Sequence, residues 1–199
     1  LHKKYRRQRQ MCIRDRYDGP QPNNEFDRHR LREYFTPFPE YYQPLEQEQT
    51  SSEEYPFFAI TQRPMMMYHS WDSQNAWLRQ ILAQNFMYMN RAKAESMGIE
   101  DMSWIWLESK TGKIRVQVKL MEGVEENTLW TWNAIGKQKG AWGLKTDANE
   151  ATDGFLLNHL INEHLPEQDG ARSITNSDPV TGQAAWYDLQ VKSLSCQTR

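Results

Sequence analysis

The sequence YPFFAITQRPMMMYHSW, residues 55–71, joins a short apolar run to a group of polar side chains. Residues 57–60 are typical of a buried strand, with Pro56 and Pro64 closing it at either end. Small hydrogen-bonding side chains and one guanidinium follow the apolar run: Thr61, Gln62, Arg63, His69 and Ser70. The stretch therefore predicts a buried strand with a polar loop at its end.

A helix is predicted after this loop, at roughly residues 73–84. The segment 72–75, Asp-Ser-Gln-Asn, supplies helix-capping residues, and four apolar side chains then fall on one helical face: Trp77, Leu78, Ile81 and Leu82. A polar loop between a strand and a helix N-terminus can bind phosphate, because free N–H groups and the helix dipole point at the anion. A core strand followed by an ordinary loop is the alternative interpretation.

The rest of the chain predicts a mainly β fold with inserted helices. The expected strands are 103–109, 114–120, 129–134 and 184–194, and the expected short helices are 27–34, 90–96 and 155–163. In the second of these strands Ile114, Val116, Val118 and Leu120 alternate with polar residues, and Lys110-Thr111-Gly112 forms the turn before it. Short strands with inserted helices favour a closed barrel over a sandwich.

Composition limits the class of protein. The 199 residues are enough for one domain with tails, and a mean hydropathy of −0.88 indicates solvated segments beside it. A net charge of −2 argues against nucleic acid as a partner. Only Cys12 and Cys196 are present, which excludes a cysteine-rich metal or iron–sulfur site in this chain. No apolar run is long enough for a membrane-spanning helix.

The chain divides into three predicted parts. Residues 1–16 carry seven of the Lys and Arg residues, and Arg9 to Arg16 resembles translated sequencing adapter, so we expect a non-native tail. A nucleic-acid-binding arm is the alternative interpretation of this segment. Residues 17–54 are rich in Pro, Glu and Tyr and predict an extended linker, and residues 55–194 form the domain. A first residue that is not methionine suggests a fragment.

Five groups of residues occur in a fixed order along the chain. They are Ile60-Thr61-Gln62-Arg63, His69-Ser70-Trp71-Asp72, Gly98-Ile99 with Trp104-Ile105, Gly140-Ala141-Trp142, and Asp178-Pro179-Val180-Thr181-Gly182-Gln183. Together they resemble the molybdopterin-dinucleotide-binding domain that closes the catalytic subunits of the dimethyl-sulfoxide-reductase superfamily. The resemblance implies a double-psi β-barrel. Within the superfamily, the segments 62–65, 68–71 and 183–188 are most similar to quinone-linked, cytoplasmic sulfite dehydrogenase catalytic subunits.

This resemblance implies a set of cofactor-binding residues. They are Thr61, Gln62, Arg63, His69, Ser70, Trp142, Asn158, Asp178, Gln183 and Tyr187. The sequence departs from the family pattern where Ile161 replaces a usual Thr, Ala184 a common Pro and Tyr187 a common Lys. Ordinary structural roles are the alternatives: a surface ion pair for Arg63 and a packed, hydrogen-bonded ring for His69.

The implied cofactor is molybdenum bis-molybdopterin guanine dinucleotide. The molybdenum ligand and the iron–sulfur cysteines would lie in upstream domains of the same polypeptide, so we assign no catalytic residue and no metal ligand here. Met65-Met66-Met67 is interpreted as adaptable packing, and His159 and His164 lack the carboxylate partners of a zinc site. The chain alone is expected to be inactive.

The implied parent enzyme oxidises sulfite and passes electrons to quinone. The expected partner subunits are an iron–sulfur subunit and a membrane anchor subunit. The chain itself is expected neither to span the membrane nor to bind nucleic acid. The expected location is cytoplasmic, peripheral to the inner membrane. The alternatives are the same domain in a formate dehydrogenase or a thiosulfate or polysulfide reductase, and a non-catalytic double-psi barrel that binds proteins.

Overall fold

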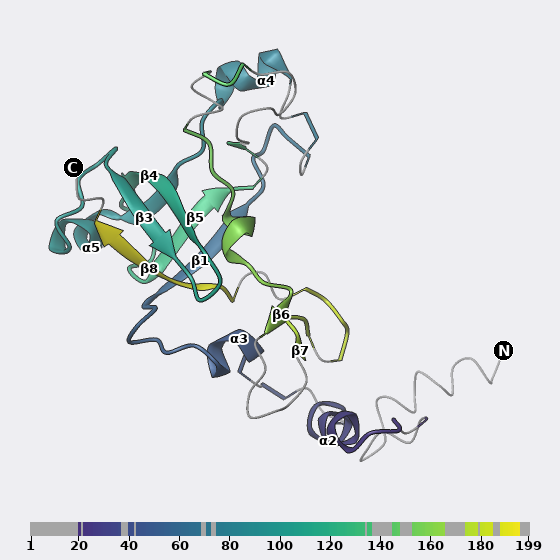
Figure 1. Cartoon of the computed structure of the whole chain (residues 1–199). Helices are drawn as coiled ribbons and strands as arrows, with labels where there is room; N and C mark the ends of the chain where they lie inside the picture. Colours follow the sequence, from purple (N-terminus) through teal and green to yellow (C-terminus); the bar gives the residue numbers. More distant parts are fainter. Residues whose placement is uncertain are drawn as a thin grey trace. The chain divides into compact units, whose positions relative to one another are not determined.

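The computed structural model describes the chain in two compact units (Figure 1). One unit comprises Leu1–Pro44 with Ser177–Ala185, and the other comprises Leu45–Asn176 with Trp186–Arg199. The described residues are 20, 22–36, 40–41, 43–68, 71–72, 75–133, 135–136, 145–147, 153–165, 174–178, 180–184 and 188–195. The predicted non-native tail, residues 1–16, lies outside them.

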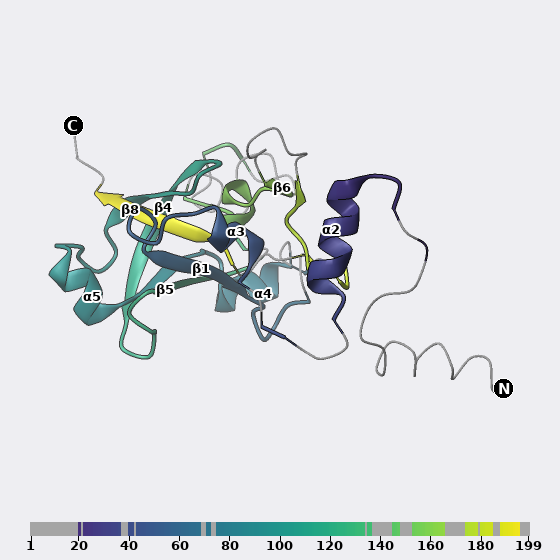
Figure 2. The ribbon, with the colours of Figure 1, turned by 90° about the horizontal axis from the view of Figure 1, so that it is seen from below.

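The larger unit is built on a closed barrel of six strands. In spatial order they are β1 (Phe57–Gln62), β5 (Thr128–Trp132), β2 (Met87–Asn90), β4 (Lys113–Met121), β3 (Trp104–Glu108) and β8 (Gln190–Ser195). Figure 2 shows β8, β1 and β5 next to one another in this order. Two neighbouring pairs, β1–β5 and β2–β4, are parallel, and the other four are antiparallel. The prediction of a mainly β, double-psi barrel is confirmed.

Buried side chains from every strand fill the barrel. Along β4, Val116 and Val118 are fully buried, whereas Arg115 before them and Lys119 after them are exposed. The same period-two pattern holds on β1, β2, β3 and β5, as expected for sheets with one buried face. The fully enclosed core side chains include Phe57, Met87, Met89, Leu107, Leu129, Phe155, Leu160 and Val191.

Most of the predicted elements are present in the structure. β1, β3, β4 and β5 lie within two residues of their predicted bounds, whereas β8 begins later than residue 184. Helix α5 (Arg91–Ser96) starts at Asn90, whose Oδ1 accepts a hydrogen bond from the Lys93 N–H at 3.0 Å. It ends before Gly98, whose φ of +68° favours glycine. The strand β2 and the short pair β6 (His164–Leu165) and β7 (Ile174–Thr175) were not predicted.

The predicted helix at roughly residues 73–84 is shorter in the structure. Helix α4 spans only Ala76–Ile81, Asn75 is its N-cap, and none of its residues is buried. Trp77 is 77% exposed and Ile81 65% exposed. Amphipathic spacing shows which side chains share a face, but a face is buried only where another element covers it.

The predicted helix at 155–163 is also shorter in the structure. It is a 3₁₀ turn, η2 (Leu157–Leu160), with Leu157 and Leu160 in the core. Its Leu160 carbonyl accepts hydrogen bonds from Ser109 Oγ at 2.8 Å and Thr111 Oγ1 at 2.7 Å. Those two side chains belong to the turn between β3 and β4 and fix η2 against the barrel.

Two helices lie in the segment predicted as a linker. Helix α2 (Glu25–Tyr34) matches the predicted helix at 27–34, and Arg32 pairs with Glu25 at 2.7 Å. Helix α3 (Leu45–Glu48) was not predicted, and it belongs to the barrel unit. The predicted start of the domain at residue 55 stays a prediction.

The segment from Leu45 to Tyr55 packs on the barrel. Leu45, Thr50 and Tyr55 are all at most 9% exposed. The Glu46 carboxylate accepts a hydrogen bond from Asn176 Nδ2 at 2.8 Å. Burial raises the pKa of Glu46, an effect that the Asn176 hydrogen bond offsets only in part.

The buried face of β4 provides a test of the barrel. Val116→Asp places a charge in the fully buried core and should lower the free energy of unfolding by more than about 4 kcal/mol. Met121→Asp on the same strand is the control, because its side chain is 42% exposed and should change stability by less than about 0.5 kcal/mol. Urea unfolding of both variants checks this, and equal midpoints would contradict it.

Glu46 provides a test that depends on pH. The folded-state pKa of Glu46 lies above the ordinary value of 4.5. Below pH 4.5 the side chain is protonated in both states and does not lower the free energy of unfolding. As the pH rises above 4.5, the unfolded state ionises first, so the free energy of unfolding falls. Glu46→Gln should therefore melt at a higher temperature than wild type at pH 8, and at the same temperature near pH 3.5. A variant that melts lower than wild type at pH 8 would contradict the assignment.

Candidate functional site

One edge of the barrel gathers strand ends that are far apart in the sequence. Because β1 and β5 are parallel, Gln62 and Trp132 end side by side, and the Asn133 N–H donates to the Gln62 carbonyl at 2.8 Å. Strand β2 is antiparallel to β5, so it begins at this same edge. We call this end of β1 and β5 the site edge.

Three of the predicted site residues lie at the site edge. Thr61 is half-buried in β1, Gln62 is the last residue of the strand and is exposed, and Arg63 follows it and is exposed. The Arg63 guanidinium lies 6.0 Å from the centre of the Tyr68 ring. Thr61 and Gln62 extend the strand rather than starting the loop, so their backbones are held by the sheet ladder.

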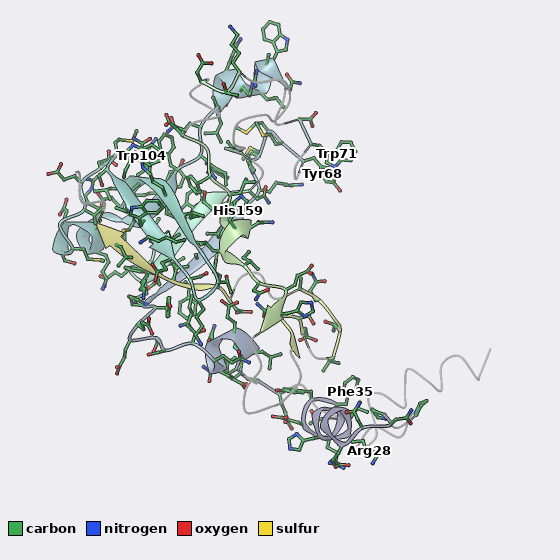
Figure 3. All side chains as sticks on the ribbon, in the orientation of Figure 1. Arg28, Phe35, Tyr68, Trp71, Trp104 and His159 are labelled. Atoms are coloured by element: carbon green, nitrogen blue, oxygen red, sulfur yellow. The ribbon has the colours of Figure 1, made fainter. Side chains whose placement is uncertain are left out.

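The segment after Arg63 exposes aromatic rings. Tyr68 and Trp71 are exposed, and the Trp71 N–H donates to the Tyr68 carbonyl at 2.9 Å. Figure 3 shows both rings on the same loop. At α4, Asn75 Oδ1 already accepts from the Trp77 N–H at 3.0 Å, so one N–H that was expected to be free for a phosphate has a partner.

Asn158 is exposed on η2, next to His159. Figure 3 labels His159 on η2, beside the barrel. A Cβ at Gly112 would lie 2.7 Å from the His159 carbonyl oxygen, so this turn needs glycine to let η2 approach. The position of Asn158 is therefore set by the β3–β4 turn.

A buried asparagine that carries no signal in the sequence organises the site edge. Asn85 is fully buried, and its Oδ1 accepts from Thr131 Oγ1 at 2.8 Å and from the Trp132 N–H at 3.2 Å. Its Nδ2 donates to the Trp132 carbonyl at 3.1 Å and the Phe155 carbonyl at 3.5 Å. One side chain thus fixes the end of β5 to the segment before η2.

Asp178 and Gln183 lie in the smaller unit, on a closed turn. Asp178 Oδ1 accepts from the Val180 N–H at 3.0 Å, the Thr181 N–H at 2.6 Å and Thr181 Oγ1 at 2.9 Å. The Asp178 N–H donates to the Gln183 carbonyl at 2.7 Å, and the Gln183 side chain is exposed. Asp178 therefore shapes the turn that presents Gln183, and a cofactor contact of either residue stays a prediction.

The remaining predicted residues are His69, Ser70, Trp142 and Tyr187, and all four lie outside the described residues. After Tyr187, burial raises the pKa of Asp188, the residue two before β8. Within the described part of the chain, no three His, Cys, Asp or Glu side chains are grouped to hold a metal. No described helix is long and apolar enough to span a membrane.

The fold resembles a solved structure. Acetylene hydratase from Pelobacter acetylenicus matches with a TM-score of 0.58 and 22% sequence identity, over 81% of this chain and 22% of that one. At this identity the likeness concerns the fold alone.

Sequence comparison shows nearer relatives. The chain is 52% identical over 174 residues to one subunit of the sulfite dehydrogenase of Allochromatium vinosum, and the match covers 87% of this chain. It is 36% identical to dopamine dehydroxylase of Eggerthella lenta over 77 residues, or 38% of this chain. The chain spans 18% of the first relative's length and 8% of the second's.

A family match covers five of the six barrel strands. Residues 57–177, from the first residue of β1 to the residue before the Asp178 turn, match the family described as "Molydopterin dinucleotide binding domain". This span includes Thr61, Gln62, Arg63 and Asn158. With more than half of its length matched, the chain belongs to the molybdopterin-dinucleotide-binding domain family.

Proposed function

We propose that the chain is the C-terminal cofactor-binding part of a molybdenum oxidoreductase catalytic subunit, and that its cofactor is bis-molybdopterin guanine dinucleotide. The observation that carries this is the 52% identity to a sulfite dehydrogenase subunit over 87% of the chain. When bound, the cofactor supplies the redox chemistry at molybdenum, and the protein binds and orients it.

The residues at the site edge fit such a cofactor. Arg63 is exposed and carries a planar guanidinium, which can pair with two oxygens of a pyrophosphate. Gln62 beside it offers both a donor and an acceptor, which a pterin or guanine edge requires. Thr61 adds a hydroxyl from a strand whose position is fixed by pairing on both sides.

The proposed substrate is sulfite. In this proposal electrons leave through iron–sulfur clusters in upstream domains and in a separate iron–sulfur subunit, and a membrane anchor passes them to quinone. The complex would lie on the cytoplasmic side of the inner membrane. The Allochromatium vinosum relative is named as one subunit of its enzyme, which supports an assembly of several polypeptides. The domain alone would not distinguish sulfite from formate, thiosulfate or polysulfide, because its side chains act on the cofactor and not on the substrate.

The cofactor contacts can be tested in the intact subunit. Arg63→Ala and Gln183→Ala should each lower molybdenum content, because each leaves a polar group of the cofactor unmatched at a cost of about 1–3 kcal/mol. Arg91→Ala is the matched control. Arg91 follows β2 and pairs with Glu122, which follows β4, and these strand ends lie opposite the site edge. Elemental mass spectrometry and a melting curve of each variant separate lost cofactor from lost fold. Full occupancy in both site variants would contradict the assignment.

The reaction can be tested by comparing the intact subunit with this chain. The intact subunit should reduce an electron-accepting dye with sulfite, and much faster than with formate, thiosulfate or polysulfide. The 199-residue chain alone should show no turnover above a no-protein control, because it supplies no cluster cysteines and the metal ligand is expected upstream. Preference for another of these donors would overturn the sulfite assignment while leaving the cofactor assignment intact.

A further inference from the structure

The segment that follows the site edge exposes large apolar side chains. Among the described residues of the larger unit, every large apolar side chain that is more than half exposed lies between Met65 and Ile81. They are Met65 at 96%, Trp77 at 77%, Trp71 at 67%, Ile81 at 65% and Tyr68 at 59%, and we call them the apolar outer set. Single exposed apolar side chains are normal in proteins, but their concentration in one segment points to an interaction surface.

The segment also has an inner side that packs on the rest of the unit. Met67 is only 4% exposed, and Leu78 is half-buried. Short-range hydrogen bonds shape the backbone: the Met67 N–H donates to the Pro64 carbonyl at 3.1 Å, and the Asn75 N–H donates to the Asp72 carbonyl at 2.9 Å. The apolar outer set therefore extends from a backbone that turns and helix α4 hold in place.

The composition of residues 65–81 is that of an interface core. The segment contains Trp, Tyr, Met and Arg, which are enriched where proteins bind one another, and neither Lys nor Glu, which are depleted there. Its charged side chains at neutral pH are Asp72 and Arg79. Permanent interfaces are more apolar than transient ones, so this composition favours a permanent contact.

The neighbouring site edge indicates what this segment contacts. The Arg63 guanidinium lies 6.0 Å from the centre of the Tyr68 ring, so the apolar outer set begins where the proposed cofactor would bind. Two cysteines are present in the chain, and no three described His, Cys, Asp or Glu side chains are grouped to hold a metal. In the proposed function the metal ligand therefore belongs to an upstream domain, and that domain meets the cofactor beside this segment.

The relatives indicate that such a domain belongs to the same polypeptide. The chain spans 18% of the length of its sulfite dehydrogenase relative, so most of a polypeptide of that kind lies outside it. A contact within one polypeptide forms on folding and stays formed, which suits a strongly apolar surface better than a partner that dissociates.

We propose that the apolar outer set is the docking surface for the upstream domains of the same polypeptide. Trp71 and Trp77 are its anchors, because large aromatic side chains contribute most of the binding energy at protein interfaces. The inference rests on the proposed function, which places the cofactor and the upstream domains at the site edge. It assigns helix α4 to domain contact, whereas the sequence suggested a phosphate site at its N-terminus.

Hydroxyl-radical footprinting of the intact subunit tests this surface directly. Peptide mass spectrometry gives the oxidation rate of each side chain, which is divided by the rate for the same residue in the unfolded protein. Met65 and Trp77 should react as slowly as Met89, which is fully buried, although they are 96% and 77% exposed in this chain. Met97 is the exposed standard and should react faster, because it is 42% exposed and follows α5, at the end of the barrel opposite the site edge.

A substitution on α4 provides the second test. A charge buried without a partner is unfavourable, so Ile81→Asp should raise the relative oxidation rate of Trp77 to that of Met97. Met121→Asp is the matched control and should leave Trp77 protected, because Met121 is 42% exposed at the end of β4. Met89 should stay protected in both variants, which verifies that the barrel is folded.

Several results would overturn the inference. Met65 and Trp77 that react like Met97 in the intact subunit would show that nothing covers them. Protection that appears only with the iron–sulfur subunit, or only at high protein concentration, would assign the surface to a separate subunit or to a second copy. Unchanged protection of Trp77 in Ile81→Asp would remove α4 from the interface.

The molybdenum content of the same samples separates these results from failure of the proposed function. A subunit that contains no molybdenum would refute the cofactor assignment. Reactive Met65 and Trp77 in a molybdenum-loaded subunit would instead refute the docking surface alone.

Discussion

The parallel pairing of β1 with β5 is the constraint on which the rest of the structure depends. Parallel neighbours cannot be joined by a tight turn, so the chain must leave β1, build other strands, and return before β5 can form. Both strands then end at the same edge, and the segments that follow them start side by side. That is why Arg63 and Asn133, which are distant in the sequence, have adjacent backbones.

A second parallel pair, β2–β4, completes the arrangement and closes the barrel. Closure leaves no free sheet edge, because each strand pairs with a neighbour on both sides. The polar groups that remain available lie at the strand ends. A barrel of this kind therefore presents a cofactor with strand ends at fixed positions, and the residues at those ends determine which groups of the cofactor can be bound.

Much of the barrel could be predicted because its signal is local. The alternation in β4 and the cap and glycine that bound α5 depend on residues only a few positions apart. β2 was missed because Met-Tyr-Met-Asn is short and its methionines fit a strand or a helix equally well, although Met87 and Met89 are fully buried. The exposure of Trp77 and Ile81 on α4 could not be predicted from their spacing, because burial depends on a covering element. The candidate site divides along the same line: Thr61 and Gln62 end a recognisable strand and Arg63 follows it, whereas the role of Asn85 arises from its contact with Phe155, which lies far away along the chain.

The two kinds of residue at the site edge are suited to different parts of binding. Arg63 is exposed and always charged, so it can attract a pyrophosphate from solution, but water screens its attraction and its long side chain is not fixed. Gln62 is neutral, so it contributes little at a distance, yet its exposed amide extends from a strand end that the sheet holds in place. That amide offers both a donor and an acceptor, so it favours a ligand that presents complementary groups at that point. Charge would therefore bring the cofactor to the edge, and the amide at the strand end would select its orientation.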